Sequence, residues 1–340
     1  MKNTWKAAVP ILALAWLLPA SGAAQTRPIE LKFSSWVSAV HGHHTGVMAP
    51  WARMVEEKSG GRLKITIYPG ATLGKPADHY DMVKDGIADM GFATPGYTPG
   101  RFPLIAVTEL PLLFKSSRGG SLAVMSIFDK HFKSEFKDVK VLWFWVHPPG
   151  HFHLARKQVR VLEDLAGLKI RSATPMLANM VKALGAIPVS IPAPDTYTAL
   201  ERGTVDGTIF PWEAISSFKL AEVLRHHVSV GLYVAPLFTF MNRKKYDSLS
   251  PDLRKVIDDL SGAWGAEFNG KVWDQNERVG IEAIKKAGAT IYPLPAEERR
   301  RWAARLEPVE DEWLKTMEAK GLPARQLLDD LREAIKRYDP

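Results

Sequence analysis

Cysteine is absent from the 340 residues of this sequence. The absence excludes disulfide bonds, thiolate metal sites and a cysteine nucleophile. It leaves the cellular compartment open, because exported bacterial proteins of this size can fold without disulfide bonds.

The sequence also lacks the short motifs of several enzyme classes. It contains no Gly-x-Ser-x-Gly, no P-loop and no dinucleotide-binding glycine fingerprint. Its acidic residues include no pair whose placement indicates a general acid and a general base. We expect a protein that is not an enzyme, although a catalytic triad is recognised by geometry and stays open as an alternative.

The first 24 residues have the pattern of a secretory signal peptide. Residues 1–6 are positive, residues 7–18 are almost entirely apolar, and residues 19–24 are small and turn-prone. We expect cleavage after Ala24, with Ala23 as the alternative site, and export of the mature chain. An uncleaved membrane anchor is the other interpretation, but the run is shorter than the ~20 residues that span a bilayer. No later stretch is long enough to span one.

The composition is that of a globular protein, with 46% hydrophobic and 24% charged residues. The length favours two domains. The formal net charge is +8, and removal of Lys2 and Lys6 with the leader leaves +6 (8 − 2). The remaining positive charges are scattered and form no basic stripe with interleaved aromatic residues, so we expect no nucleic-acid partner.

Strands and helices are expected to alternate through the first hundred residues, which predicts an α/β fold with a parallel sheet. The expected strands are 29–36, 62–68 and 88–93, and the expected helices are 48–58 and 78–86. Ligands bind beyond the carboxyl ends of such strands. This rule predicts ligand contacts in residues 36–44, in residues 92–97 and at Arg171.

A break at residues 147–153 follows the apolar strand 139–146, and we interpret it as a crossover between domains. Residues 228–242 are expected to form one strand that returns to the first domain. The other expected elements are strands 168–171, 188–191 and 207–210, helices 120–132, 175–185 and 195–202, one or two helices over 251–286, and an amphipathic helical tail from residue 295.

Arg171 ends a short apolar stretch, residues 168–171, which reads as a buried strand. An arginine is seldom buried without a partner. Its planar fork can hold a carboxylate through two hydrogen bonds, so Arg171 is a candidate ligand clamp. A salt bridge to a neighbouring acidic residue is the structural alternative.

Histidines crowd two expected loops, with His41, His43 and His44 in the first and His147, His151 and His153 in the second. Such spacing can ligate zinc, but neither loop has an acidic partner and His-Glu-x-x-His is absent, so we predict no metal site. Either His41 or His44, together with His151 or His153, is a candidate hydrogen-bond donor to an anion. Surface polar loops are the alternative.

The expected strand 207–210 ends at Phe210, and Pro211 and Trp212 follow it directly. Aromatic side chains at the mouth of a crevice can form an apolar wall for a ligand. Ordinary core packing is the alternative interpretation.

Several ordered stretches of the mature chain resemble the DctP-type solute-binding proteins of TRAP (tripartite ATP-independent periplasmic) transporters. Each stretch is weakly specific, but their common order covers nearly the whole mature chain. They are residues 51–68 (WARMVEEKSGGRLKITIY), 70–74, 83–90, 109–114, 164–171, 184–186, 197–207 (YTALERGTVDG) and 242–249.

The resemblance implies an α/β, two-lobed clamshell with a long helix across the hinge, in the periplasm. It implies lobe I from residues 25–148 and 237–276, and lobe II from residues 149–236 and 277–340. It further implies an organic acid bound between the lobes and delivery to small and large membrane permease subunits. Arg171 lies at the position of the family's usual carboxylate clamp. No cofactor is implied.

Two departures from the family pattern bear on the ligand. Many members carry a second arginine where this chain has Gly150-His151-Phe152-His153, and many dicarboxylate and sialic-acid binders have an asparagine near Pro211. A single arginine with added aromatic residues favours a monocarboxylate with an apolar body, such as an aromatic, 2-oxo or 2-hydroxy acid. The predicted ligand contacts are Arg171, Trp36, His41, His44, Phe92, Tyr97, His151, His153, Phe210, Pro211, Trp212, Phe238 and Asn242, with Phe240 beside them.

Other classes remain as alternatives at this point. One is a C4-dicarboxylate binder with the same fold. Another is a secreted hydrolase or metal-binding protein that uses the histidine loops, and a third is the binding protein of an ABC importer.

Overall fold

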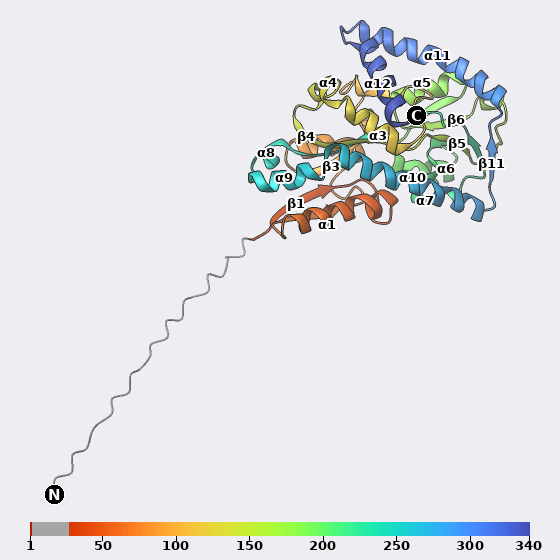
Figure 1. Ribbon diagram of the computed structural model, residues 1–340. Helices are drawn as coiled ribbons and strands as arrows, with labels where there is room; N and C mark the ends of the chain where they lie inside the picture. Colours follow the sequence, from red (N-terminus) through yellow and green to blue (C-terminus); the bar gives the residue numbers. More distant parts are fainter. Residues whose placement is uncertain (2–26) are drawn as a thin grey trace.

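The computed structural model describes residues 27–340 together with Met1, so the predicted signal peptide lies outside the described part apart from its first residue. Two β-sheets with helices packed around them form the two halves of the molecule (Figure 1). We refer to the half built on the first sheet as lobe I and to the other as lobe II. No helix within residues 27–340 is long and apolar enough to cross a bilayer.

The sheet of lobe I has five strands in the order β2-β1-β3-β10-β4. Strand β1 runs parallel to β2 and β3, whereas β10 is antiparallel to β3 and β4. The strands are β1 (Ile29–Ser34), β2 (Leu63–Tyr68), β3 (Met90–Ala93), β4 (Val139–Val146) and β10 (Pro236–Asn242). Six helices belong to this lobe: α1 (Ala49–Lys58), α2 (His79–Lys84), α3 (Ser117–Ser126), α4 (Phe128–His131), α8 (Arg243–Asp247) and α9 (Pro251–Asp259).

The sheet of lobe II has six strands in the order β11-β9-β5-β8-β6-β7, with β6 parallel to both β7 and β8. The strands are β5 (His151–Leu154), β6 (Lys169–Ser172), β7 (Ile187–Ser190), β8 (Gly207–Phe210), β9 (His226–Ser229) and β11 (Thr290–Pro293). Its short helices are α5 (Pro175–Ala183), α6 (Thr196–Glu201) and α7 (Trp212–Ser217). Thr174 caps α5, because its side-chain oxygen accepts a hydrogen bond from the Leu177 N–H.

Single helical turns fill several of the connections. One π-helical turn spans His44–Met48. The 3₁₀ turns are Pro76–Asp78, Pro95–Tyr97, Ile105–Glu109, Lys133–Phe136, Leu162–Leu165, Ala193–Asp195 and Leu220–Glu222.

The chain passes from one sheet to the other at three places. Residues 147–150 join β4 of the first sheet to β5 of the second, and residues 230–235 join β9 to β10. The prediction of one strand over residues 228–242 was wrong. Gly231 has a φ of 66°, which interrupts extended structure, so the run forms two strands in different sheets.

Helix α10 (Gly262–Lys286) is the third connection, and it lies along both lobes (Figure 1). It packs on α3 and β4 of lobe I and on α7 of lobe II. Glycines permit this close packing. A Cβ atom at Gly280 would lie 1.8 Å from the Trp212 carbonyl oxygen, and one at Gly270 would lie 2.5 Å from the Arg118 Cα.

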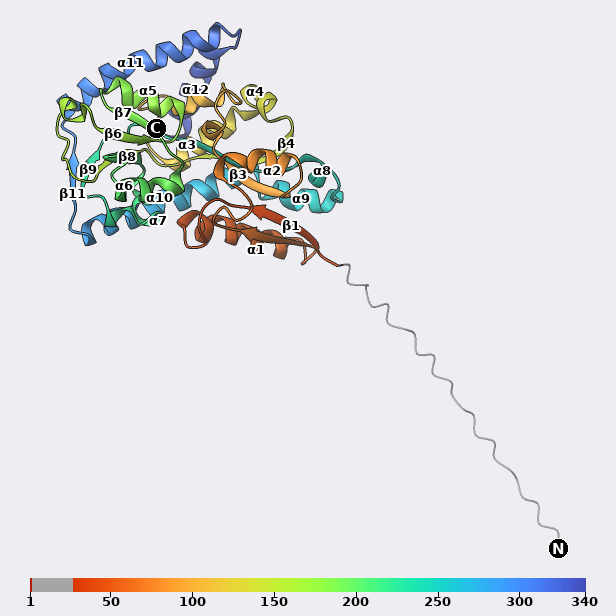
Figure 2. The ribbon, with the colours of Figure 1, turned by 180° about the vertical axis from the view of Figure 1, so that it is seen from behind.

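Two long helices end the chain, α11 (Ala296–Glu318) and α12 (Ala324–Tyr338). The apolar stripe expected on the tail is buried, and its residues are Trp302, Leu306, Val309, Trp313 and Met317. Helix α11 packs on α5 and crosses the outside of the molecule (Figure 2). Strand β11 was not expected from the sequence.

Helix α12 departs from the predicted division, which placed the whole of residues 277–340 with lobe II. It packs against α3 of lobe I. The Asp339 carboxylate accepts hydrogen bonds from the backbone N–H of Lys115 (2.6 Å) and from the backbone N–H and hydroxyl of Ser116 (3.2 and 2.6 Å). These bonds fix the end of the chain to the start of α3.

The substitution Gly280→Ala tests the contact between α10 and α7. Alanine is ordinarily better than glycine inside a helix by about 1 kcal/mol. Here the added methyl group would meet backbone atoms of Trp212, so we expect the free energy of unfolding to fall by about 3 kcal/mol. Urea denaturation measures it. Val279→Ala on the same helix, where the side chain is 50% exposed, is the control and should change stability by less than about 0.5 kcal/mol. Unchanged stability of Gly280→Ala would contradict the packing described here.

Candidate functional site

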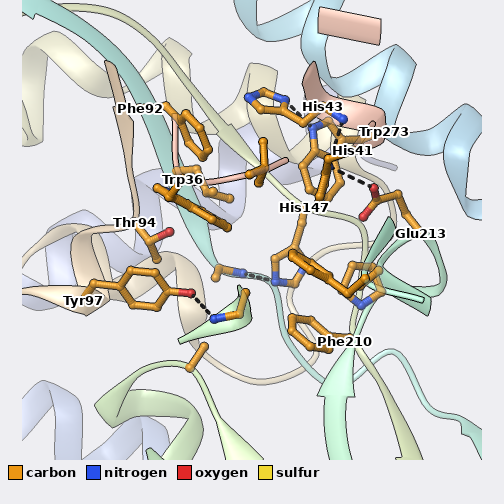
Figure 3. Close-up of a pocket in the computed structure, with 18 of the residues that line it drawn as sticks. Trp36, His41, His43, Phe92, Thr94, Tyr97, His147, Phe210, Glu213 and Trp273 are labelled. Atoms are coloured by element: carbon orange, nitrogen blue, oxygen red, sulfur yellow. Dashed lines mark hydrogen bonds and ion pairs between the residues drawn. The ribbon is translucent and has the colours of Figure 1, made fainter. Parts of the chain in front are cut away.

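A cavity lies between the lobes at the carboxyl ends of β1, β3, β6 and β8 (Figure 3). Its lining side chains leave about 530 Å³ of space free of protein atoms, part of it open to solvent. Lobe I, the crossing segments and α10 contribute Trp36, Val37, His41, His43, Phe92, Thr94, Tyr97, His147, Tyr233, Ala235, Leu237 and Trp273, and lobe II contributes Arg171, Ala173, Ala193, Phe210, Pro211, Glu213, Ala214 and Phe218.

Arg171 is the cation in this cavity, and its side chain is 0% exposed. Its Nε–H donates a hydrogen bond to the Ile191 carbonyl oxygen at 2.8 Å, which fixes the plane of the guanidinium. The terminal nitrogens Nη1 and Nη2 are buried and have no hydrogen-bond partner. No carboxylate of the described residues lies within 4.0 Å of the group. A buried charge without a partner is costly, so the site is built to receive an anion.

Two aromatic residues of the cavity, Phe210 and Tyr97, contact Arg171 and Ala193, respectively. The Phe210 ring lies 4.3 Å from the Arg171 Cζ, in a cation–π contact. The Tyr97 hydroxyl oxygen accepts a hydrogen bond from the Ala193 N–H at 3.0 Å, which leaves the hydroxyl proton available to a ligand. Since Tyr97 belongs to lobe I and Ala193 to lobe II, this bond also joins the lobes.

His147 lies in the crossing segment between β4 and β5. Its Nε2 accepts a hydrogen bond from the Ala235 N–H at 3.0 Å, so the proton is on Nδ1, next to the Pro148 carbonyl oxygen. Burial lowers the pKa of His147 to about 4. The neutral ring holds the two interlobe crossing segments together.

His43 is not in a loop, because the helix that contains α1 already begins at residue 42, and His41 lies in the bend directly before that helix. The His41 Nδ1 accepts a hydrogen bond from the His43 N–H at 3.1 Å, and the His43 Nδ1 accepts one from the Trp273 Nε1–H at 3.2 Å. Burial lowers the pKa of His41 to about 3 and that of His43 well below its usual value. Both rings are therefore neutral, with the remaining proton on Nε2.

Glu213 faces these histidines from the start of α7 (Figure 3). Its Oε1 accepts a hydrogen bond from the Ser217 hydroxyl and lies 3.7 Å from the His41 Nδ1. Its Oε2 is buried without a partner. Burial raises the pKa of the Glu213 carboxyl to about 7.

Aromatic rings form most of the remaining lining. Trp36 packs on Phe92 with ring centroids 4.8 Å apart and on Tyr97 at 6.0 Å. On the other lobe, Phe210 stacks on Phe218 at 5.7 Å. The walls are thus suited to a flat apolar body.

Seven of the predicted contacts line the cavity, and six do not. Those that line it are Arg171, Trp36, His41, Phe92, Tyr97, Phe210 and Pro211. The six that do not are His44, His151, His153, Trp212, Phe238 and Asn242. Phe240, considered beside them, also lies elsewhere.

The lobe II histidines serve the core instead of the cavity. The His151 Nδ1 accepts hydrogen bonds from the N–H groups of Val230 (3.0 Å) and Gly231 (3.1 Å), and its ring stacks on Trp212. His153 bonds the Phe210 carbonyl oxygen (3.0 Å) and the His227 Nδ1 (2.7 Å). These partners explain why neither histidine is free to bind a ligand.

Of the four remaining residues, Trp212 is the stacking partner of His151, and Phe238, Asn242 and His44 lie away from the cavity. The Phe238 ring packs on Phe136 at 4.8 Å, on the face of β10 opposite to Leu237. The Asn242 side chain caps α8 and donates to the Val83 and Lys84 carbonyl oxygens. His44 lies on the π-helical turn and does not reach the cavity.

Seven polar or aromatic lining residues were not among the predicted contacts: His43, Thr94, His147, Glu213, Phe218, Tyr233 and Trp273. His43 and His147 were noted in the sequence as members of the two histidine clusters. Glu213 directly follows the predicted wall of Phe210 to Trp212, and this adjacency was its only signal. Tyr233 and Trp273 carry no local signal, since a crossing segment and α10 bring them in from distant parts of the chain.

Metal binding finds no support in this arrangement. Within the part of the chain that the structure describes, no three side chains among His, Cys, Asp and Glu are grouped to hold a metal ion. The cavity instead presents one cation, neutral histidines, the Glu213 carboxyl group and aromatic walls.

The molecule has two sheets joined by three connections, and a cavity suited to an anion lies at the ends of their strands. These features define a two-lobed solute-binding protein. A profile of the family described as bacterial extracellular solute-binding protein, family 7 (DctP), matches residues 33–316. The chain belongs to this family, the DctP family of TRAP transporter solute-binding proteins. Its members are periplasmic receptors for small organic acids that work with membrane permease subunits. The predicted family and two-lobed α/β fold are confirmed.

Three solved structures illustrate the similarity. A TRAP solute-binding protein from Rhodoferax ferrireducens T118, in complex with copurified benzoate, is 37% identical with a TM-score of 0.89, over 91% of this chain and 98% of that one. A marine-metagenome protein specific for aromatic acid ligands, with 3-hydroxybenzoate, is 36% identical (TM-score 0.89; 92% and 99% covered). A Bordetella bronchiseptica protein with (R)- and (S)-mandelate is 31% identical (TM-score 0.86; 92% and 100% covered).

Buried titratable groups make the stability of the protein depend on pH in a defined way. Histidines with lowered pKa bind fewer protons in the folded state, so the free energy of unfolding falls as pH drops from 6.5 towards 3–4. They include His41 (about 3), His147 (about 4), His151 (about 3) and His227 (about 4).

Buried carboxyl groups act in the opposite direction. Their pKa is raised by burial, so the folded state holds protons that the unfolded state releases above about pH 4.5, and stability falls as pH rises. They are Glu109 (about 8), Glu135 (about 7), Glu213 (about 7) and Glu277 (about 8).

The two groups together predict maximal stability near pH 6.5. Below pH 6.5, protonation of the more numerous histidines lowers the free energy of unfolding. Above pH 6.5, ionisation of the buried carboxyl groups lowers it. We expect the free energy of unfolding to fall by about 2 kcal/mol or more between pH 6.5 and 8.5, measured by urea denaturation. Glu135→Gln should make this alkaline fall shallower. Constant or rising stability across that range would contradict the assignment.

Proposed function

We propose that this protein captures an aromatic monocarboxylate between its lobes and delivers it to a TRAP permease. The observation that carries the proposal is the buried Arg171 guanidinium, whose Nη1 and Nη2 have no partner. A carboxylate placed against these nitrogens would accept two charge-assisted hydrogen bonds in the fork geometry that arginine offers.

The rest of the cavity supports an aromatic body for the ligand. Trp36, Phe92 and Tyr97 line one lobe, and Phe210 and Phe218 line the other. The similar structures contain benzoate, 3-hydroxybenzoate and mandelate, which are all aromatic monocarboxylates. We infer the same ligand class here from the combination of one free cation and aromatic walls.

A C4-dicarboxylate fits the cavity less well. Such a ligand needs a cation for each carboxylate, and Arg171 is the one cationic side chain among the described lining residues. Glu213 would repel a second carboxylate. We also propose that the protein binds its ligand without converting it chemically. Its relatives are receptors, and the cavity histidines are neutral and already accept hydrogen bonds.

We further propose that the lobes, divided near residues 148 and 236, close over the ligand. Several contacts join them in the present conformation. The Thr174 hydroxyl of lobe II donates to the Glu109 carboxyl of lobe I, the Ala193 N–H of lobe II donates to Tyr97, and the Gly42 N–H of lobe I donates to the Ser217 hydroxyl at 3.3 Å. A carboxylate on Arg171 would add a further link.

Replacement of Arg171 tests this proposal. We expect Arg171→Met to weaken benzoate binding at least about 100-fold in titration calorimetry, because two charge-assisted bonds of about 1.5–3 kcal/mol each are lost. The same variant should not be less stable than the wild type, because methionine fills similar volume and removes an unpaired buried charge.

The matched control is Arg101→Ala. Arg101 pairs with Asp81 at 2.9 Å outside the cavity, and its loss should leave benzoate affinity within about threefold. A thermal-shift screen of organic acids completes the test. Stabilisation by dicarboxylates alone, or undiminished benzoate binding by Arg171→Met, would refute the proposal.

A further inference from the structure

Glu213 is a second polar centre in the cavity, separate from Arg171. Its carboxyl group is not within 4.0 Å of the guanidinium, and its nearest charged or titratable neighbours are His41 and Glu277. Figure 3 shows Glu213 and Tyr97 on opposite sides of the side chains drawn, and Tyr97 hydrogen-bonds Ala193, close to the Ile191 carbonyl that holds Arg171. Because Arg171 and Glu213 line the same cavity, a ligand that is held by Arg171 and fills the cavity would also meet Glu213.

Only one of the two carboxyl oxygens of Glu213 is engaged. Oε1 accepts from the Ser217 hydroxyl, which itself accepts from the Gly42 N–H at 3.3 Å. The side chain is only 2% exposed, and Oε2 has neither a protein partner nor access to solvent. A buried polar atom without a partner is destabilising unless something in the cavity supplies the hydrogen bond.

The surroundings of Glu213 contain no positive charge to balance it. His41 is neutral with its Nδ1 acting as an acceptor, so it cannot donate from that atom to Oε1. Glu277 adds a second carboxyl group, whose Oε1 accepts from the Glu213 backbone N–H at 2.8 Å. The ionised form of Glu213 would repel another anionic group at this place, whereas a neutral group that can donate would be bound.

A hydroxyl group meets both requirements. It can donate to Oε2 when Glu213 is ionised and accept from Oε2 when Glu213 is protonated. The His43 Nε2, which carries the ring proton, is buried without a partner in the lining of the same cavity and is a second donor for a ligand hydroxyl. Figure 3 shows His43 beside His41 on the Glu213 side of the cavity.

We propose that Glu213 is a specificity-determining residue, which selects aromatic monocarboxylates with a hydroxyl group on the ring and rejects aromatic dicarboxylates. The inference rests on the proposed function, since it takes the ligand's carboxylate to be bound by Arg171. It adds a second recognition point that depends on different atoms.

Titration calorimetry with six ligands tests the assignment: benzoate, its three monohydroxy derivatives and the 1,3- and 1,4-benzenedicarboxylates. For the wild type we expect at least one hydroxybenzoate to bind at least tenfold more tightly than benzoate, and both dicarboxylates to bind at least tenfold more weakly. In Glu213→Leu the ratio of hydroxybenzoate to benzoate affinity should fall to within about threefold of one, since the polar partner is lost.

A second variant is expected to gain affinity for a dicarboxylate, and a gain of affinity cannot result from misfolding. Glu213→Gln keeps the shape of the side chain and removes its charge, so it should bind a dicarboxylate at least tenfold more tightly than the wild type does. Glu135→Gln is the matched control. Glu135 is also a buried glutamate with a raised pKa, but it bonds the Leu104 and Ile105 N–H groups away from the cavity, and its variant should keep the wild-type ratios.

The outcomes separate the two proposals. If the folded wild type binds benzoate but shows no preference for any hydroxybenzoate, or if the preference persists in Glu213→Leu, the role of Glu213 is refuted and the proposed function stands. If none of the aromatic acids binds, the proposed function itself is refuted, and the inference falls with it.

Discussion

The binding site depends on a guanidinium that is fully buried and has only one of its three nitrogens hydrogen-bonded. Arg171 is 0% exposed, one of its nitrogens is bonded to Ile191, and the other two face the cavity without partners. Burial of such a charge opposes folding unless an anion compensates it. The position is set by β6, whose pairing with β7 and β8 holds Arg171 at the point where the lobes meet.

The other buried polar groups of the site are arranged around this charge without competing for it. The histidines of the cavity are neutral, since burial lowers their pKa and backbone or indole N–H groups donate to them. The carboxyl group of Glu213 is kept out of reach of Arg171. As a result, the strongest interaction in the cavity is left for the ligand, and the aromatic walls and Glu213 decide which acid fits.

The sequence predicted the parts of this arrangement that follow from local pattern. Alternating apolar residues located most strands, and Arg171 was recognised as a charge in a buried strand. The predictions failed where the direction of a side chain depends on register or on distant segments. Leu237 faces the cavity and Phe238 faces the core, because neighbours on a strand point to opposite sides. His151 and His153 bind partners from residues 227–231, which no local pattern could reveal.

The central claim is that Arg171 binds the ligand through its negative charge, and the most direct measurement changes the ligand alone. Benzoate and benzamide have nearly the same shape, but only benzoate carries a charge. The account predicts that the wild-type protein binds benzoate in titration calorimetry at least about 100-fold more tightly than benzamide. Equal affinities for the two compounds would contradict it.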